Sequence, residues 1–334
     1  MKQQPPLPQK PAYWKPVIHN NHRRVLWHDY RGRSIYMVTV TKRRGAPEFG
    51  YLTGATATEA HIEPTAAGEV IAAEIKATPA HNPEIRILSF VIMPDHFHLL
   101  MFVTREMPRP LGSVIQALKA AATRKIRATC ARATAGGDEP IFEEGFHDRI
   151  LTGEGQLETL RRYIADNPRR LFVKRAMPDL FRRHNHLMVD DMEFAAYGNI
   201  FLLRDFDKMN VVVHRADTPE TRRENERKWL ACARNGGVLV STFISPAERQ
   251  IRDKAIDAGG RLVVLRNEGF EERFKPSGRE FELCAEGKLL LLAPWPDGRS
   301  RMAVTRREAL AMNELARRLA TLSAHSRMSL RQQG

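Results

Sequence analysis

The chain has 334 residues, which is longer than most single domains, so two domains are expected. Lys and Arg total 53 against 39 Asp and Glu, and the formal net charge of +14 favours a polyanionic partner, although a generally basic protein fits equally well. No apolar run reaches the ~18 residues of a membrane span, and the N-terminal stretch lacks an apolar signal-peptide core, so we expect no membrane partner. The three cysteines are scattered singly, which fits a reducing cytoplasm.

The first half of the chain predicts alternating strands and helices. Residues 34–41 are rich in β-branched and aromatic side chains and predict a strand, and residues 85–93 and 96–103 predict a strand pair that turns at Pro94-Asp95. The other expected elements are a hairpin over 49–58, helices over 64–77, 112–129 and 157–167, and a strand over 146–152. Pro168 is expected to end or kink the last helix. Antiparallel strands with helices to one side predict an α+β domain of the ferredoxin-like kind.

The pattern changes near residue 198, where apolar strands alternate with helices. The expected strands cover 201–206, 210–215, 236–243, 260–267 and 288–295, and the expected helices cover 219–235, 246–258, 279–286 and 305–323. Such strands predict an α/β domain with a parallel sheet that helices cover on both faces. We therefore expect a basic, aromatic arm over residues 1–30, a catalytic domain over 31–178 and an α/β domain over 198–325.

Two histidines flank one bulky apolar residue in the segment Pro94-Asp95-His96-Phe97-His98. Alternate side chains of a strand share a face, so His96 and His98 are expected to point the same way while Phe97 points into the core. Two adjacent imidazoles fit a metal site better than a core, although two half-buried histidines on an edge strand are the simpler alternative.

The helix expected over 157–167 carries Tyr163 and Asn167, which lie four residues apart and therefore share one face. An amphipathic core tyrosine and a helix cap would explain both residues. Arg161 and Arg162 precede the tyrosine, and two further arginines follow Pro168. This concentration of cations suits a phenol that meets a phosphodiester.

Together, these segments resemble the HUH single-strand transposases with one catalytic tyrosine, and in particular the REP-associated tyrosine transposases. The resemblance rests on the strand at 35–41, PDHFHLL at 94–100, FEEGFHDRIL at 142–151, and Tyr163-Ile164 through Asn167-Pro168. It covers roughly residues 30–175. Relaxases usually place the tyrosine before the histidines, so the order found in this sequence favours the transposase branch over a replication initiator or relaxase.

The resemblance implies a divalent cation, Mg²⁺ or Mn²⁺, held by His96, His98 and Asn167, with Tyr163 as the nucleophile. Attack by Tyr163 on phosphorus implies a 5′-phosphotyrosine and a free 3′-hydroxyl. Free tyrosine has a pKa of ~10 and needs help to react near neutrality. Imidazole ligands alone would favour softer metals, so the residues themselves do not select the ion.

Single-stranded or hairpin DNA is the implied substrate, and a homodimer is possible. Candidate DNA contacts are basic side chains of the catalytic domain, although solvated surface charge explains most of them equally well. They are Lys119, Arg124, Lys125, Arg149, Arg161 and Arg162.

The second domain is similar to the Rossmann-like core of the DNA-processing protein A superfamily, on the segments 236–242 and 258–265. There, a strand that ends in small residues leads into a helix N-terminus, which implies phosphate binding by Ser241 and Thr242. Thr242 stands where that superfamily usually has Gly, so a structural turn is an equal alternative.

We therefore expect a metal-dependent single-strand DNA transposase or endonuclease that cuts and rejoins hairpin DNA. The alternative is a non-catalytic DNA-binding or nucleotide-sensing protein derived from a transposase. The presence of His96, His98, Tyr163 and Asn167 argues against a decayed site.

Overall fold

The structure is a computed structural model of the whole chain. It describes residue 25 and residues 28–129, 139–271, 274–294, 304–323 and 326–330. Most of the predicted arm over residues 1–30 lies outside these ranges. The chain divides into two compact units, Met1–Phe172 and Val173–Gly334, which we describe separately. No helix of the described residues is long and apolar enough to cross a membrane.

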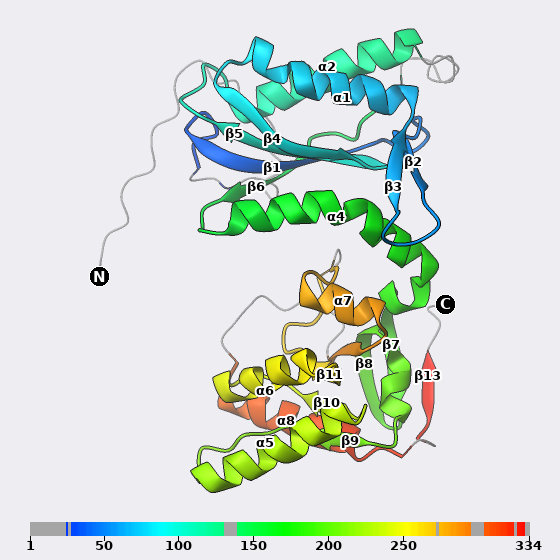
Figure 1. Cartoon of the computed structure of the whole chain (residues 1–334), viewed down its shortest axis with the longest axis vertical. Coiled ribbons are helices and arrows are strands. Elements are labelled where there is room, and N and C mark those ends of the chain that lie inside the picture. Colours follow the sequence, from blue (N-terminus) through cyan, green and yellow to red (C-terminus); the bar gives the residue numbers. More distant parts are fainter. Residues whose placement is uncertain are drawn as a thin grey trace, which may run out of the picture. The chain divides into compact units, whose positions relative to one another are not determined.

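The first unit is built on a four-stranded antiparallel sheet in the order β4-β5-β1-β6. Its strands are β1 (Ser34–Thr41), β4 (Ile85–Ile92), β5 (His96–Val103) and β6 (His147–Leu151). Its helices are α1 (Ala66–His81), α2 (Leu111–Thr129) and α4 (Gln156–Ala176). The sheet and helices fit the predicted α+β class, but the helices do not all lie to one side. α1 and α2 cover one face of the sheet and α4 covers the other (Figure 1).

Strand alternation sends side chains to two separate cores. Val38 on β1 and Phe97 and Leu99 on β5 are buried against α1 and α2. Met37 and Leu100, one position along on the same strands, pack against Leu160 and Ile164 of α4, among others. The α4 face of the sheet is therefore the face on which His96 and His98 stand.

The predicted hairpin over 49–58 is longer in the structure, and α4 does not end at its proline. The hairpin pairs β2 (Gly50–Thr53) with β3 (His61–Pro64). α4 continues past Pro168 to Ala176. Proline removes one backbone donor from a helix, but Arg170 and Val173 beyond it are buried, and packing of that turn outweighs the loss.

The second unit has a seven-stranded mixed sheet in the order β13-β7-β8-β12-β11-β10-β9. Its strands are β7 (Arg183–Val189), β8 (Met192–Gly198), β9 (Lys208–Asn210), β10 (Val238–Ser241), β11 (Arg261–Leu265), β12 (Leu289–Ala293) and β13 (Met328–Leu330). Strands β9 to β12 are parallel, and β8 joins β12 in the antiparallel sense.

Helices cover both faces of the parallel strands, as predicted. They are α5 (Pro219–Arg234), α6 (Pro246–Asp257), α7 (Arg279–Ala285) and α8 (Arg306–Ala320). α5, α6 and α7 contribute to one core, and α8 packs against the opposite face. Parallel neighbours follow chain order from β9 to β12, so the crossover helices share one side of the sheet.

Three sequence expectations for this unit differ from the structure. The strand expected over 210–215 is displaced, because β9 covers Lys208–Asn210 and residues 211–215 are not in a strand. The expected strand over 201–206 is a 3₁₀ helix, η2 (Ile200–Arg204), in which Leu202 and Leu203 are buried while Phe201 is 66% exposed. The Asn199 side chain accepts a hydrogen bond from Phe201 N and starts this turn. The hairpin of β7 and β8, preceded by the 3₁₀ helix η1 (Pro178–Phe181), occupies the segment left between the predicted domains.

Candidate active site

The two histidines of β5 point to the α4 face of the sheet, and Phe97 between them is completely buried in the opposite core. This is the alternation expected of a strand. The side chain of His96 is 24% exposed. His98 is 7% exposed, so its imidazole is buried beneath the neighbouring side chains.

Each imidazole has one nitrogen directed at the other histidine and one held by a polar neighbour. The two Nε2 atoms are 3.2 Å apart. His96 Nδ1 lies 2.7 Å from Asp95 Oδ1, and His98 Nδ1 lies 2.8 Å from Thr39 Oγ1. Thr39 reaches His98 because β1 and β5 pair in a register that places these two residues opposite one another.

The structure brings Tyr163 of α4 next to this histidine pair. The ring centroids of Tyr163 and His98 are 5.7 Å apart, and the rings are tilted by 55°. Tyr163 is half-buried, so its ring is neither lost in the core nor fully solvated. Asn167, one helical turn further along, is 7% exposed, and its Nδ2 donates to Tyr163 O at 2.7 Å. That hydrogen bond leaves the amide oxygen as the acceptor available to a ligand.

Arg170 lies beside Tyr163, although the sequence analysis did not distinguish it from the neighbouring arginines. Its guanidinium carbon lies 5.5 Å from the Tyr163 ring centroid, and the residue is 8% exposed. A guanidinium over an aromatic face is an attractive arrangement, and it is stronger when water is excluded. The spacing of seven residues, two helical turns, is the signal that could have identified Arg170.

The side chains present fit a divalent cation. Among the described residues no three His, Cys, Asp or Glu side chains cluster as a metal site, so any cation would need other donors. His96 Nε2 and His98 Nε2 converge, and both Nδ1 atoms have polar partners of the kind that orient metal-binding imidazoles. An amide oxygen such as that of Asn167, which shares the helix face of Tyr163, would add an oxygen donor to the two nitrogens, and borderline and hard divalent ions accept such a mixed set.

Residues 66–167 match the family model of IS200-like transposases. The matched stretch contains both histidines of β5, Tyr163 and Asn167. The match supports a transposase function for the part of the chain that carries these four residues. A comparison with curated proteins finds no match.

Several solved structures resemble the chain in part, among them the following two. One is a REP-associated tyrosine transposase bound to a REP hairpin, with 17% identity, coverage of 45% of this chain and 73% of that chain, and a TM-score of 0.31. The other is DNA processing protein A from Helicobacter pylori, studied for its single-stranded DNA binding, with 16% identity, coverage of 42% and 69%, and a TM-score of 0.28.

The predicted basic contacts separate onto the two faces of the first unit. Arg161 and Arg162 are exposed on α4. Arg149 of β6 is exposed and pairs in register with Met37, whose side chain packs on the α4 face. These three arginines, which we call the α4-side arginines, share the face of the sheet on which the histidines stand.

The three predicted contacts on α2 lie on a helix over the opposite face of the sheet, and two of them have structural partners. Lys119 Nζ donates to Glu143 O at 2.6 Å and to Gly145 O at 2.9 Å, and burial lowers the pKa of Lys119. Lys125 pairs with Glu74 of α1. Lys119 and Lys125 therefore have structural partners on the face opposite the histidines, and their contact with DNA stays a prediction. Arg124 is exposed.

The two hydroxyls predicted to bind phosphate in the second unit are engaged inside the protein. Ser241 is completely buried, and its Oγ accepts from Phe243 N at 3.1 Å. Thr242 Oγ1 donates to Asn313 Oδ1 of α8 at 3.3 Å. These are the contacts of a structural turn. A doubly wound sheet binds nucleotides where its strand order reverses, and the described parallel strands β9 to β12 have no reversal.

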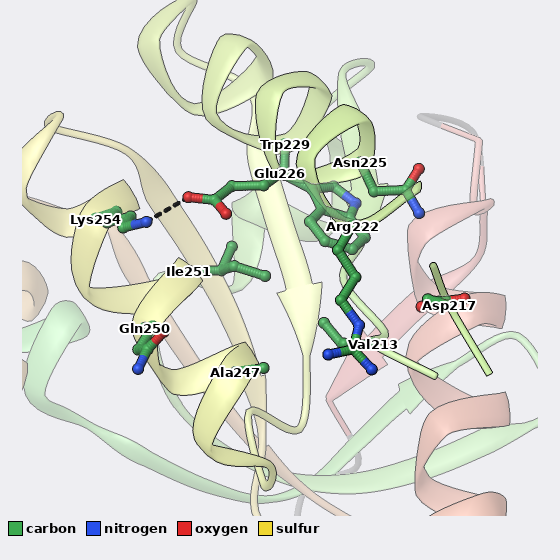
Figure 2. A pocket seen from close by; sticks show the side chains of 10 residues that line it. All are labelled: Val213, Asp217, Arg222, Asn225, Glu226, Trp229, Ala247, Gln250, Ile251 and Lys254. Atoms are coloured by element: carbon green, nitrogen blue, oxygen red, sulfur yellow. Dashed lines mark hydrogen bonds and ion pairs between the residues drawn. The ribbon is translucent and has the colours of Figure 1, made fainter. Parts of the chain in front are cut away.

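A pocket of about 210 Å³ lies elsewhere in the second unit, between α5 and α6 (Figure 2). Trp229 and Ile251 line it, Arg222 extends across it, and an ion pair joins Glu226 to Lys254 at its side. The Trp229 indole donates to Asn210 O at 3.0 Å and is 6% exposed. Its ring is therefore fixed in the core and offers a ligand little of its surface.

Proposed function

We propose that the protein is a metal-dependent single-strand DNA transposase that cleaves and rejoins hairpin-containing DNA through a 5′-phosphotyrosine. The observation that carries this proposal is the position of Tyr163, whose ring lies 5.7 Å from that of His98, beside two converging imidazole nitrogens. A phenol and a pair of metal-ligand side chains are the groups that such a reaction requires.

In the proposed reaction, Tyr163 Oη attacks the scissile phosphorus and its proton passes to solvent. The P–O3′ bond breaks, which leaves a 3′-hydroxyl on one strand and a 5′-phosphotyrosine on the other. Attack by another 3′-hydroxyl then forms a new phosphodiester and returns the phenol. One P–O bond replaces another in each step, so no nucleotide cofactor is consumed.

The proposed cation ligands are His96 Nε2, His98 Nε2 and Asn167 Oδ1. A bound Mg²⁺ or Mn²⁺ supplies Lewis-acid stabilisation of charge on the phosphate and its leaving oxygen. Arg170 holds the Tyr163 ring, and the buried side of α4 limits the directions from which a strand can approach. The α4-side arginines are the proposed phosphate contacts of the incoming strand.

We also propose a ferredoxin-like fold for the first unit and a Rossmann-like fold for the second. The first unit runs strand, helix, strand, strand, helix, strand, with β5 between β1 and β4, and this split β-α-β arrangement supports the ferredoxin-like description. In the second unit, the four parallel strands support a Rossmann-like description that is limited to one half of such a fold.

A labelled hairpin oligonucleotide tests the proposed activity. The full chain is incubated with Mn²⁺ and an oligonucleotide labelled at either end, and the products are run on a denaturing gel. We expect an adduct that carries only the 3′ label, because the tyrosine retains the 5′-phosphate of the downstream fragment. Chelation of the metal should abolish it.

The matched pair Tyr163→Phe and Tyr51→Phe identifies the nucleophile. Tyr51 of β2 is another tyrosine of the first unit and is 60% exposed, so its hydroxyl is accessible but lies outside the proposed site. We expect Tyr51→Phe to form the adduct normally and Tyr163→Phe to form none. An adduct that persists in Tyr163→Phe contradicts the proposal. DNA binding by wild-type protein without any adduct would support the non-catalytic alternative.

A further inference from the structure

Four polar side chains stand in sequence across the end of the first sheet, namely Asp95, His96, His98 and Thr39. Asp95 Oδ1 lies 2.7 Å from His96 Nδ1, and His96 Nε2 lies 3.2 Å from His98 Nε2. His98 Nδ1 in turn lies 2.8 Å from Thr39 Oγ1. The following inference rests on the proposed cation site and concerns how its ligands are prepared.

The chemistry of the four groups fixes where the protons lie when both imidazoles are neutral. An ionised carboxylate can only accept, so His96 Nδ1 is the donor to Asp95 and His96 Nε2 carries a lone pair. A second lone pair facing it at 3.2 Å would be repelled, so His98 Nε2 carries the proton and donates. His98 Nδ1 then carries no proton and accepts a hydrogen bond from the Thr39 hydroxyl.

Cation binding demands a different arrangement at one histidine only. His96 already presents the Nε2 lone pair that a cation needs. His98 presents an N–H and must lose that proton to solvent while Nδ1 gains one, so the imidazole changes tautomer with no net release of protons. The new Nδ1–H then needs an acceptor at the position of Thr39 Oγ1.

We propose that Thr39 is a positioning residue that allows His98 to exchange tautomers when the cation binds. A hydroxyl donates to a bare Nδ1 and, after rotation about its C–O bond, accepts from Nδ1–H. A carboxylate or carbonyl at this place would hold His98 in the metal-binding tautomer permanently. The two histidines therefore have unequal roles. Asp95 holds His96 in the tautomer that a cation needs, and Thr39 allows His98 to change to that tautomer.

Nitrogen-15 NMR of the histidine side chains tests this inference without DNA. The full chain contains 12 histidines, and the His98 signals are identified by their loss in His98→Gln. We expect wild-type His98 to be protonated at Nε2 in metal-free protein and at Nδ1 when saturated with Mg²⁺. His96 should be protonated at Nδ1 in both states.

Threonine variants supply the second measurement. Thr41 is a matched control, because it stands opposite His96 on the same strand and, among the described residues, its hydroxyl has no hydrogen-bond partner. Loss of a side chain that orients a metal ligand typically weakens metal affinity about 10- to 100-fold. We expect a loss of that size for Mn²⁺ in Thr39→Val, recovery in Thr39→Ser and wild-type affinity in Thr41→Val, with unchanged circular dichroism spectra.

Either of two results overturns the inference: His98 protonated at Nδ1 in metal-free wild-type protein, or Thr39→Val binding Mn²⁺ as tightly as Thr41→Val. Absence of cation binding by wild-type protein overturns it as well. An adduct that persists in Tyr163→Phe removes the proposed nucleophile but leaves the NMR result unaffected, so the two failures are distinguishable.

Discussion

The candidate site brings together residues of three elements, because Thr39 of β1 and Tyr163 of α4 both contact His98 of β5. Strand alternation places His96 and His98 on one face, and helical spacing places Tyr163 and Asn167 on another. The Thr39 contact was not predictable in this way, because Thr39 lies 59 residues before His98 and reaches it only through the register of β1 against β5. Register is a property of the folded sheet, which a local pattern does not contain.

Lys119 has a structural role that its charge alone does not predict. Its ammonium group holds the backbone carbonyls of Glu143 and Gly145, whereas Arg124 on the same helix is exposed. Because charged hydrogen bonds of this kind contribute to stability, we expect Lys119→Met to lower the free energy of unfolding by about 1–3 kcal/mol. Arg124→Met should change it by less than about 0.5 kcal/mol. Urea denaturation of both variants measures the difference, and equal stabilities would contradict the structural role.

Tyr36 makes the stability of the protein sensitive to alkaline pH. Burial raises the pKa of Tyr36 to about 12, and its hydroxyl lies 2.7 Å from His28 Nε2. An unfolded chain releases the phenolic proton near pH 10, so the folded state holds more protons between pH 10 and 12 and loses stability as the pH rises through that range. A shift of this size corresponds to a loss of about 2–3 kcal/mol.

Comparing the pH dependence of two tyrosine variants isolates this effect. Tyr36→Phe should be less stable than wild type at neutral pH, because the His28 contact is lost, but its stability should fall less steeply from pH 10 to pH 12. Tyr51→Phe, which changes an exposed tyrosine, should follow wild type. Denaturation midpoints at each pH give the slopes, and identical slopes for wild type and Tyr36→Phe would exclude the proposed linkage.

Secondary-structure elements were predictable where one periodicity extended over the whole segment. The strand over 34–41 and the helix that begins at Pro246 were expected with nearly their observed bounds. The errors came where two signals competed. Pro168 predicted an end or a kink in α4, and the helix does not end there, because buried side chains beyond Pro168 stabilise it. The apolar residues of 201–206 predicted a strand, but two buried leucines occupy a 3₁₀ turn there.

The start of α6 shows how one element is fixed to another. Ser245 and Glu248 form a capping box, in which Glu248 Oε2 accepts from Ser245 N at 3.1 Å. Glu248 is 4% exposed, and its Oε1 accepts from Val213 N at 3.2 Å, in the segment that follows β9. This carboxylate therefore satisfies a helix terminus and a separate loop together.

A matched pair of glutamates tests this double role. Glu308 occupies the same capping-box position in α8, where it is half-buried. Glu308→Ala should cost about 1 kcal/mol, as expected for loss of a cap. Glu248→Ala should cost about 2–4 kcal/mol, because it also removes the hydrogen-bond acceptor of the half-buried Val213 N–H. Chemical denaturation of the full chain provides both values, and equal costs would show that the Val213 contact contributes nothing.

At the scale of the whole molecule, the net charge of +14 predicts a polyanionic partner but not the surface that meets it. Within the first unit, the sheet separates two sets of basic side chains. Arg161 and Arg162 belong to the helix that carries Tyr163, whereas Arg124 belongs to a helix on the other face. Composition predicts a class of partner, and the fold distinguishes the two sets of basic side chains.

The salt dependence of DNA binding shows which of these two surfaces contacts DNA. The logarithm of the affinity falls linearly with the logarithm of the salt concentration, and each phosphate neutralised on a single strand adds about 0.7 to the magnitude of that slope. If the strand lies along the face that carries Tyr163, replacing both Arg161 and Arg162 with Gln should reduce that magnitude by up to about 1.4 and weaken binding of every oligonucleotide sequence alike. Arg124→Gln, which removes one exposed cation from the far face, should leave the slope unchanged. Fluorescence anisotropy with a labelled hairpin over a range of salt concentrations measures all three proteins. A reduced slope in Arg124→Gln alone would place the DNA across α2, where no strand could reach Tyr163.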